Sequence, residues 1–263
     1  VKDLDLVSAL FFPSIEIASN TNIHGRFASH MNLIEINANA PYVDISGIRF
    51  SKVNANAVTV GKELQIKVAS SQMKVADSIR VNHILLDSKM ITDEVNLSVN
   101  WASKTSLPEA DATLNAKARF AGSRIDINLL PSLILIEDTL WQVNEENLIV
   151  VDTGLVRFKN LSFVHDDEFV RIDGLISKSQ EDELDVILDN FQLRNLNPFI
   201  QQQGIELAGS TKGIFSISGL MNKPFFKSNL EVSGIKVNNE LIGDGSIISK
   251  WDPNSNKIIL DAK

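Results

Sequence analysis

The sequence predicts an all-β protein built as an antiparallel meander. Apolar and polar residues alternate with a period of two over many short stretches, and polar turn-forming residues separate those stretches. Helical periodicity is scarce. Because period-two alternation gives a strand one apolar face and one polar face, we expect a sheet whose two sides differ in chemistry.

Five stretches show this alternation most cleanly, and each is predicted to form a strand: Glu63–Val68, Val95–Trp101, Ala112–Phe120, Arg124–Leu129 and Asn229–Ser233. In the first, leucine, isoleucine and valine alternate with glutamate, glutamine and lysine. Noisier alternation extends the pattern to Ser14–Ala18, Phe169–Ile176, Leu184–Leu188 and Lys257–Ala262.

Polar turn residues lie between these runs, for example at Ala121–Ser123, His165–Glu168 and Ser177–Glu183. The phase of the alternation slips at Gly47, where we expect a β-bulge.

Two segments are candidates for minor short helices. Leu196–Gln203, with Pro198 near its first turn, is the better one, and Lys2–Phe12 is weaker. No linker or composition shift marks a domain boundary, so residues 1–263 are expected to form a single continuous segment.

Composition argues against several function classes. The chain has 263 residues, of which 44% are hydrophobic, so it can build a sizeable core. Its net charge of −8 argues against nucleic acid and disfavours anionic membrane surfaces. The absence of cysteine excludes disulfides, thiolate zinc sites, iron–sulfur clusters and cysteine nucleophiles. Since Val1 is not an initiator Met and no leader follows it, we expect a fragment or a mature segment.

Candidate catalytic and metal-binding residues are weak. His24, His30, His83 and His165 lie far apart without ligand spacing, and we expect them to be solvated or structural. The acidic clusters Asp166-Asp167-Glu168 and Glu181-Asp182-Glu183 are expected to be solvated hairpin turns rather than calcium sites or acid–base pairs. No nucleophile elbow, P-loop or dinucleotide motif occurs, so no catalytic residue, metal or cofactor is predicted and the chain is expected not to be an enzyme.

The apolar face has two possible uses. A second sheet would seal it in a closed sandwich, whereas a sheet bent into a trough would leave it lining a groove. Acyl chains suit such a groove, because burial gains about 0.8 kcal/mol per CH₂ without any aimed polar group. Periodicity alone does not choose between the two. The residues predicted to line a groove are Leu64, Ile66, Val68, Val95, Leu97, Val99, Trp101, Leu114, Phe120, Ile125, Ile127, Leu129, Val170, Ile172, Val186, Leu188, Leu230, Val232, Ile258 and Leu260.

An ordered series of motifs in the second half carries a family resemblance: LLPSLILIEDTLWQV (129–143), FVRIDGLIS (169–177), LDVILDNFQLRNLNPFI (184–200), GIELAGSTKGIFSISGLMNKPFFKSNLEVSGIKVN (204–238) and NELIGDGSIISKW (239–251). In this order they resemble TamB-like proteins of the translocation and assembly module family. The resemblance covers residues 125–263, and residues 1–124 agree in style. AsmA-like relatives, among the bridge-like lipid transfer proteins, share the style.

The resemblance implies an elongated β-taco, a long sheet curled about a hydrophobic groove. It implies a periplasmic portion of a larger protein that is anchored in the inner membrane of a Gram-negative bacterium. The implied cargo is phospholipid acyl chains, nascent outer-membrane protein or both. The full-length protein would meet an Omp85-type outer-membrane barrel (TamA-like), and membrane contact would come from segments outside this chain. The family supplies no catalytic residue.

Two rival interpretations remain open. The first is a β-sandwich or solenoid binding module of a cell-surface protein, adhesive or glycan-binding. The second is an enzyme on a β-scaffold, which would require a cleft with at least two convergent titratable groups.

Overall fold

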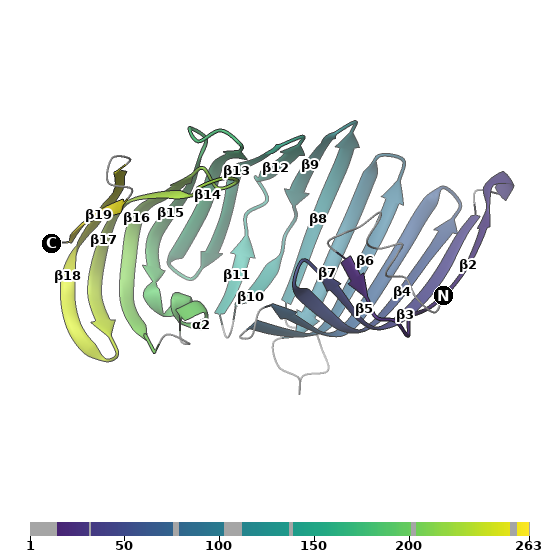
Figure 1. Ribbon diagram of the computed structural model, residues 1–263, viewed down its shortest axis with the longest axis horizontal. Helices are drawn as coiled ribbons and strands as arrows, with labels where there is room; N and C mark the ends of the chain where they lie inside the picture. Colours follow the sequence, from purple (N-terminus) through teal and green to yellow (C-terminus); the bar gives the residue numbers. More distant parts are fainter. Residues whose placement is uncertain are drawn as a thin grey trace. The chain divides into compact units, whose positions relative to one another are not determined.

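The computed structural model describes residues 15–31, 33–75, 79–102, 112–136, 139–200, 204–252 and 257–262. Antiparallel strands make up nearly all of this part of the chain, which confirms the all-β prediction (Figure 1). No helix in these residues combines the length and the apolar character needed to cross a membrane.

Contacts divide the chain into two compact units. The first comprises residues 1–119 and 132–138, and the second comprises residues 120–131 and 139–263. The expectation of one continuous segment concerns how these units join, and it stays a prediction.

The first unit is a meander in which β2 to β8 pair in chain order. β1 and β2 both pair with β3, at opposite ends of that strand, and β10 pairs with β8 through Leu133 and Thr113. A 3₁₀ turn, η1 (Ser29–Met31), joins β2 to β3. The strands of the first unit are β1 (Ile15–Ile17), β2 (Asn22–Ala28), β3 (Leu33–Ile45), β4 (Ile48–Val60), β5 (Glu63–Val75), β6 (Ile79–Ile91), β7 (Glu94–Ala102), β8 (Ala112–Ala121) and β10 (Leu133–Ile136).

The register of the first unit gathers apolar residues on one face. Three rows of directly paired residues share this face: Leu64/Met90/Val95/Ala118, Ile66/Ser88/Leu97/Ala116 and Val68/Leu86/Val99/Leu114. The opposite face is charged. There Glu94 binds Lys117 at 2.8 Å and Arg119 at 3.3 Å, and the hydrogen bond from Lys117, reinforced by Arg119, lowers the pKa of Glu94.

The second unit is also a meander, with β12 to β19 paired in chain order. β9 pairs with β12, and β11 pairs with the end of β13 that β12 leaves free. Figure 1 shows β16, β17 and β18 curving along their length. The strands are β9 (Arg124–Leu129), β11 (Thr139–Val143), β12 (Leu148–Asp152), β13 (Leu155–His165), β14 (Glu168–Ser177), β15 (Glu183–Gln192), β16 (Leu207–Ser218), β17 (Phe225–Val237), β18 (Glu240–Asp252) and β19 (Lys257–Ala262).

Burial is shallow throughout the described residues. Buried apolar side chains such as Trp141, Leu161 and Val232 are scattered rather than gathered in a thick layer. The largest side chain exposed by less than 2% is that of Ser162. The apolar rows of both units are instead mostly half-buried, so a sheet face that is only partly covered takes the place of a sealed core.

Two local predictions have clear outcomes. The bulge expected at Gly47 is wrong, because Ser46–Gly47 form a two-residue turn that places Ile45 opposite Ile48. Across such a turn, residues on one face change from odd to even numbers, which is the phase slip seen in the sequence. The helix predicted near Pro198 is confirmed over α2 (Asn197–Ile200).

The helical segment as a whole begins at Leu193, three residues earlier than predicted, because the 3₁₀ turn η2 (Leu193–Leu196) precedes α2. Residues 201–203 and the candidate helix Lys2–Phe12 lie outside the described residues.

Gly213 occupies a position in β16 that only glycine fits. Its φ of +132° is outside the range that side-chain-bearing residues adopt, and a Cβ there would lie 2.1 Å from the carbonyl oxygen of Asn229. The close approach of β17 to β16 therefore depends on the missing side chain.

We expect Gly213→Ala to lower the free energy of unfolding by about 3 kcal/mol or more, since steric conflict adds to backbone strain. The matched control is Gly154→Ala, where φ is +75° but nothing lies within 4 Å of the added carbon. The control should lose only about 1 kcal/mol. Urea unfolding measures both variants, and equal losses would contradict the role given to the contact with β17.

Candidate functional site

An apolar cavity of about 650 Å³ lies in the second unit. Every lining side chain is apolar except that of Thr211, whose hydroxyl donates to the Glu231 carbonyl at 3.0 Å. The lining residues are Val170, Val186, Leu188, Phe191, Leu193, Leu196, Leu207, Thr211, Phe215, Leu230, Val232, Ile235 and Ile247.

Cross-strand register explains why these residues meet. One row of directly paired residues crosses the floor of the cavity: Val170/Leu188/Gly213/Leu230/Ile247. Residues paired in an antiparallel sheet share a face, so the five strands β14 to β18 turn their apolar sides to the same space. Gly213 contributes no side chain to the row, which leaves room between Leu188 and Leu230.

Charged side chains of the second unit lie on the opposite face of the same strands. Lys212 pairs with Glu231 at 2.9 Å, and this hydrogen bond raises the pKa of Lys212. Both residues alternate with cavity-lining neighbours along β16 and β17, so they point away from the cavity. No charged residue is among the lining side chains in the described part of the chain.

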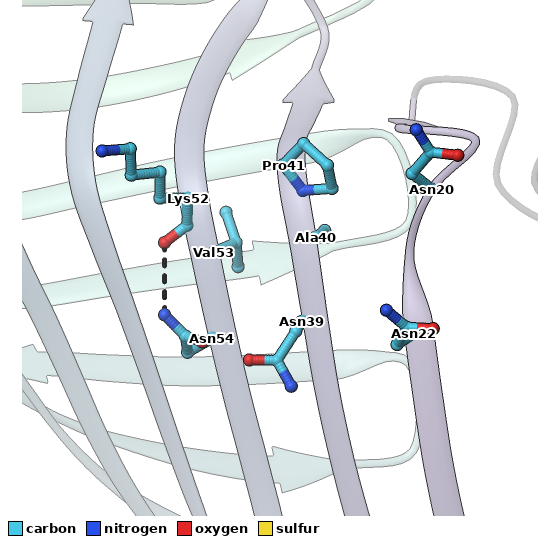
Figure 2. A pocket seen from close by; sticks show the side chains of 8 residues that line it. All are labelled: Asn20, Asn22, Asn39, Ala40, Pro41, Lys52, Val53 and Asn54. Carbon is cyan, nitrogen blue, oxygen red and sulfur yellow. Dashed lines mark hydrogen bonds between the residues drawn. The ribbon is translucent and has the colours of Figure 1, made fainter.

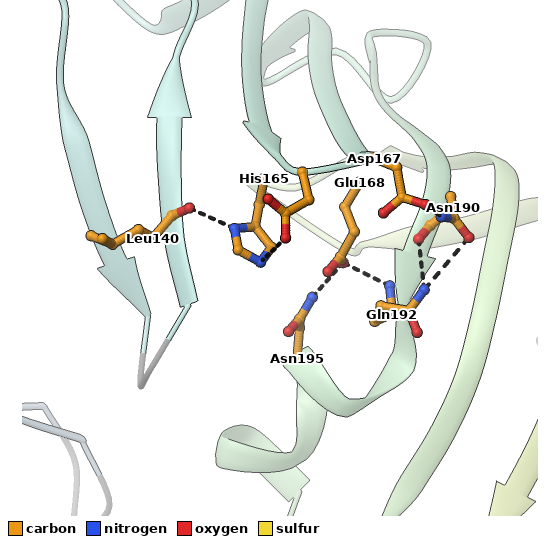
Figure 3. A network of polar contacts seen from close by, with 8 residues as sticks. Leu140, His165, Asp167, Glu168, Asn190, Gln192 and Asn195 are labelled. Atoms are coloured by element: carbon orange, nitrogen blue, oxygen red, sulfur yellow. Dashed lines mark hydrogen bonds and ion pairs between the residues drawn. The ribbon is translucent and has the colours of Figure 1, made fainter.

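Leu193 and Leu196 of the turn η2 line the cavity, and the buried carboxylate of Glu168 bonds to this turn (Figure 3). Glu168, only 2% exposed, accepts hydrogen bonds from the Gln192 backbone N–H at 2.8 Å and from Asn195 Nδ2 at 2.7 Å. On the far side of η2, Asn197 donates to the Leu207 carbonyl at 3.1 Å and accepts from the Leu207 N–H at 2.8 Å.

The expectation of a solvated acidic turn is confirmed for Asp166 and Asp167 but is wrong for Glu168. Glu168 begins β14, and period-two alternation puts it on the same face as Val170. That spacing was the signal for its burial. His165 beside this turn is structural: its Nδ1 lies 2.8 Å from the Leu140 carbonyl oxygen and its ring centroid is 5.7 Å from that of Trp141.

Of the twenty residues predicted to line a groove, the cavity brings together Val170, Val186, Leu188, Leu230 and Val232. Ile172 shares their face but lies beyond the cavity. In the first unit the predicted residues of β5, β7 and β8 share one half-buried face: Leu64, Ile66, Val68, Val95, Leu97, Val99, Trp101 and Leu114.

The other predicted residues are elsewhere. Phe120 is 39% exposed near the end of β8. Ile125, Ile127 and Leu129 are half-buried on β9, which pairs with β12. For Ile258 and Leu260 the structure gives the pairing of β19 with β18, while their side chains lie outside its description. Whether any of these residues contacts lipid stays a prediction.

Sequence reasoning missed eight lining residues, because they lie where the alternation is interrupted or outside the strands. They are Phe191, Leu193, Leu196, Leu207, Thr211, Phe215, Ile235 and Ile247. Glycines break up the pattern around Phe215 and Ile247. Leu193 and Leu196 follow a helical spacing that strand periodicity does not detect.

A second, polar pocket of about 300 Å³ lies in the first unit (Figure 2). Asn22, Asn39 and Asn54 are paired across β2, β3 and β4 at its rim, and Lys52 adds a cation. The remaining lining residues are Asn20, Ala40, Pro41 and Val53. Side-chain amides both donate and accept hydrogen bonds, so this pocket suits a hydroxyl-rich ligand.

In the described residues, no group of three or more histidine, cysteine, aspartate or glutamate side chains is arranged to hold a metal ion. No family model, curated protein or solved structure matches the chain. The resemblance to TamB-like proteins therefore stays a prediction.

We expect Glu168→Ala to destabilise the second unit by about 2 kcal/mol, because it leaves two donors at η2 without their acceptor. Asp167→Ala is the control, since that carboxylate belongs to the same turn but is exposed, and its effect should stay within about 0.5 kcal/mol. Thermal and urea unfolding test both variants. Similar losses at the two positions would contradict the role of Glu168 at η2.

Proposed function

We propose that this protein is a non-enzymatic lipid-binding scaffold whose apolar cavity holds acyl chains. The observation that supports this proposal is the chemistry of the lining. Apart from Thr211, whose hydroxyl already bonds to the Glu231 carbonyl, the lining offers only hydrocarbon. The volume of about 650 Å³ lies within the range of about 300–1,000 Å³ that is typical of small-molecule sites.

The energetics favour a hydrocarbon chain over a polar ligand. Each methylene that enters gains about 0.8 kcal/mol, whereas a polar group would lose its water without gaining a partner. A lipid headgroup would therefore stay outside the cavity. The site would recognise acyl chains without selecting the headgroup.

In the wider proposal, the groove serves phospholipid transport between the inner and outer membranes, outer-membrane protein assembly, or both. The resemblance of residues 125–263 to TamB-like proteins supports a periplasmic location in a protein anchored to the inner membrane. It also supports contact of the full-length protein with an Omp85-type barrel. The half-buried apolar rows of the first unit would offer a second surface of similar chemistry.

Ile247 and Ile248 offer a matched test of the cavity, because they are identical neighbours on opposite faces of β18. Ile247 lines the cavity, whereas Ile248 faces away and is 44% exposed. We expect Ile247→Asp to weaken binding of a fluorescent fatty acid at least about tenfold by placing a charge against the chain. Ile248→Asp should bind like the wild type.

Mass spectrometry of lipids extracted from the purified protein complements this titration. Equal affinity of the two variants would show that the probe binds elsewhere. A wild-type protein that binds no fatty acid and carries no lipid would overturn the proposal.

The asparagine pocket favours a second candidate function, glycan binding by a cell-surface module. Asn39→Ala combined with Asn54→Ala should abolish retention on a glycan array, because both amides line that pocket. Asn37→Ala is the control, since Asn37 shares the face of Asn39 on β3 but lies outside the pocket. If the wild-type protein retains no glycan, this function is excluded.

A further inference from the structure

The end of the cavity at η2 is built differently from its floor. β15 ends at Gln192 and β16 begins at Leu207, so the chain reverses direction at this edge of the sheet. Between these strands, Leu193 and Leu196 of η2 line the cavity. Phe191, Leu207 and Ile235 line the same end from β15, β16 and β17. The floor consists of strands alone, whereas this end also carries a helical turn.

Polar side chains fasten this wall on two sides. Glu168 holds the start of η2 through Gln192 and Asn195. Asn197, the residue after η2, bonds to Leu207, the first residue of β16. Glu168 is almost fully buried, so water competes little for its two hydrogen bonds. A turn that is held from both sides resists displacement by a ligand, and it therefore limits the space in front of it.

We propose that η2 sets the maximum length of acyl chain that the cavity accepts. Leu193 and Leu196 are the specificity-determining residues of this wall, and Glu168 and Asn197 are its positioning residues. This inference rests on the proposed function. Until the chain reaches η2, each added methylene is buried and tightens binding about fourfold. Methylenes beyond that length stay in water, and the affinity levels off.

The test is a series of saturated fatty acids that differ in length by two methylenes, each competing with a fluorescent fatty acid for the whole protein. Wild-type affinity should rise with length and then level off. Leu193→Ala combined with Leu196→Ala should move the levelling point to longer chains. Leu193→Trp should move it to shorter chains.

The matched control is Leu220→Ala combined with Leu241→Ala, two exposed leucines outside the cavity, which should keep the wild-type levelling point. Asn197→Ala should lengthen the accepted chain without altering any lining side chain. Should the double variant at η2 fail to fold, Leu196→Ala alone serves, because that side chain is already 38% exposed.

The outcomes separate the two proposals. If the wild type binds fatty acids but every η2 variant levels off at the wild-type length, or if the wild type never levels off, η2 is not the wall and the inference fails. The proposed function then stands. If the wild type binds none of the acids, the proposed function itself fails.

Discussion

The cross-strand register is the constraint on which the rest of this structure depends. In each unit, directly paired residues carry one chemical character from strand to strand, as in the row from Val170 to Ile247. A slip of one residue in any pair would turn an apolar set to the charged face and bring ion pairs such as Lys212–Glu231 to the apolar side. The register therefore both builds the cavity and keeps charge out of it.

The sequence predicted the strands well, because period-two alternation is a direct consequence of the pleat. Arg124–Leu129 matches β9 residue for residue, and the turn at His165–Glu168 separates β13 from β14. The slip at Gly47 was misassigned because a two-residue turn and a bulge both change the phase of alternation. The site was harder to predict, since Leu193 and Leu196 follow no strand period and a carboxylate such as Glu168 is ordinarily solvated.

The connection between β15 and β16 shows how an apolar site uses polar groups. A short turn satisfies its own backbone, whereas this longer connection brings backbone amides beside a hydrocarbon-lined space. Asn197 satisfies the backbone of Leu207, because its side-chain amide donates to the Leu207 carbonyl and accepts from the Leu207 N–H as a neighbouring strand would. Glu168 accepts the hydrogen bond of the Gln192 N–H. Polar residues at the edge thus allow the interior to remain free of them.

A lining without polar anchors also has a kinetic consequence for the proposed function. A chain held only by dispersion and the hydrophobic effect breaks no hydrogen bond when it shifts along the floor from Val186 toward Leu230, so shifts within the cavity meet small barriers. Total affinity would grow with buried length, and the wall proposed at η2 would cap that length. A cap on buried length would also limit the residence time of the chain, because differences in affinity arise mostly from the rate of release. Under the proposed function, such a site would be better suited to passing acyl chains onward than to storing them.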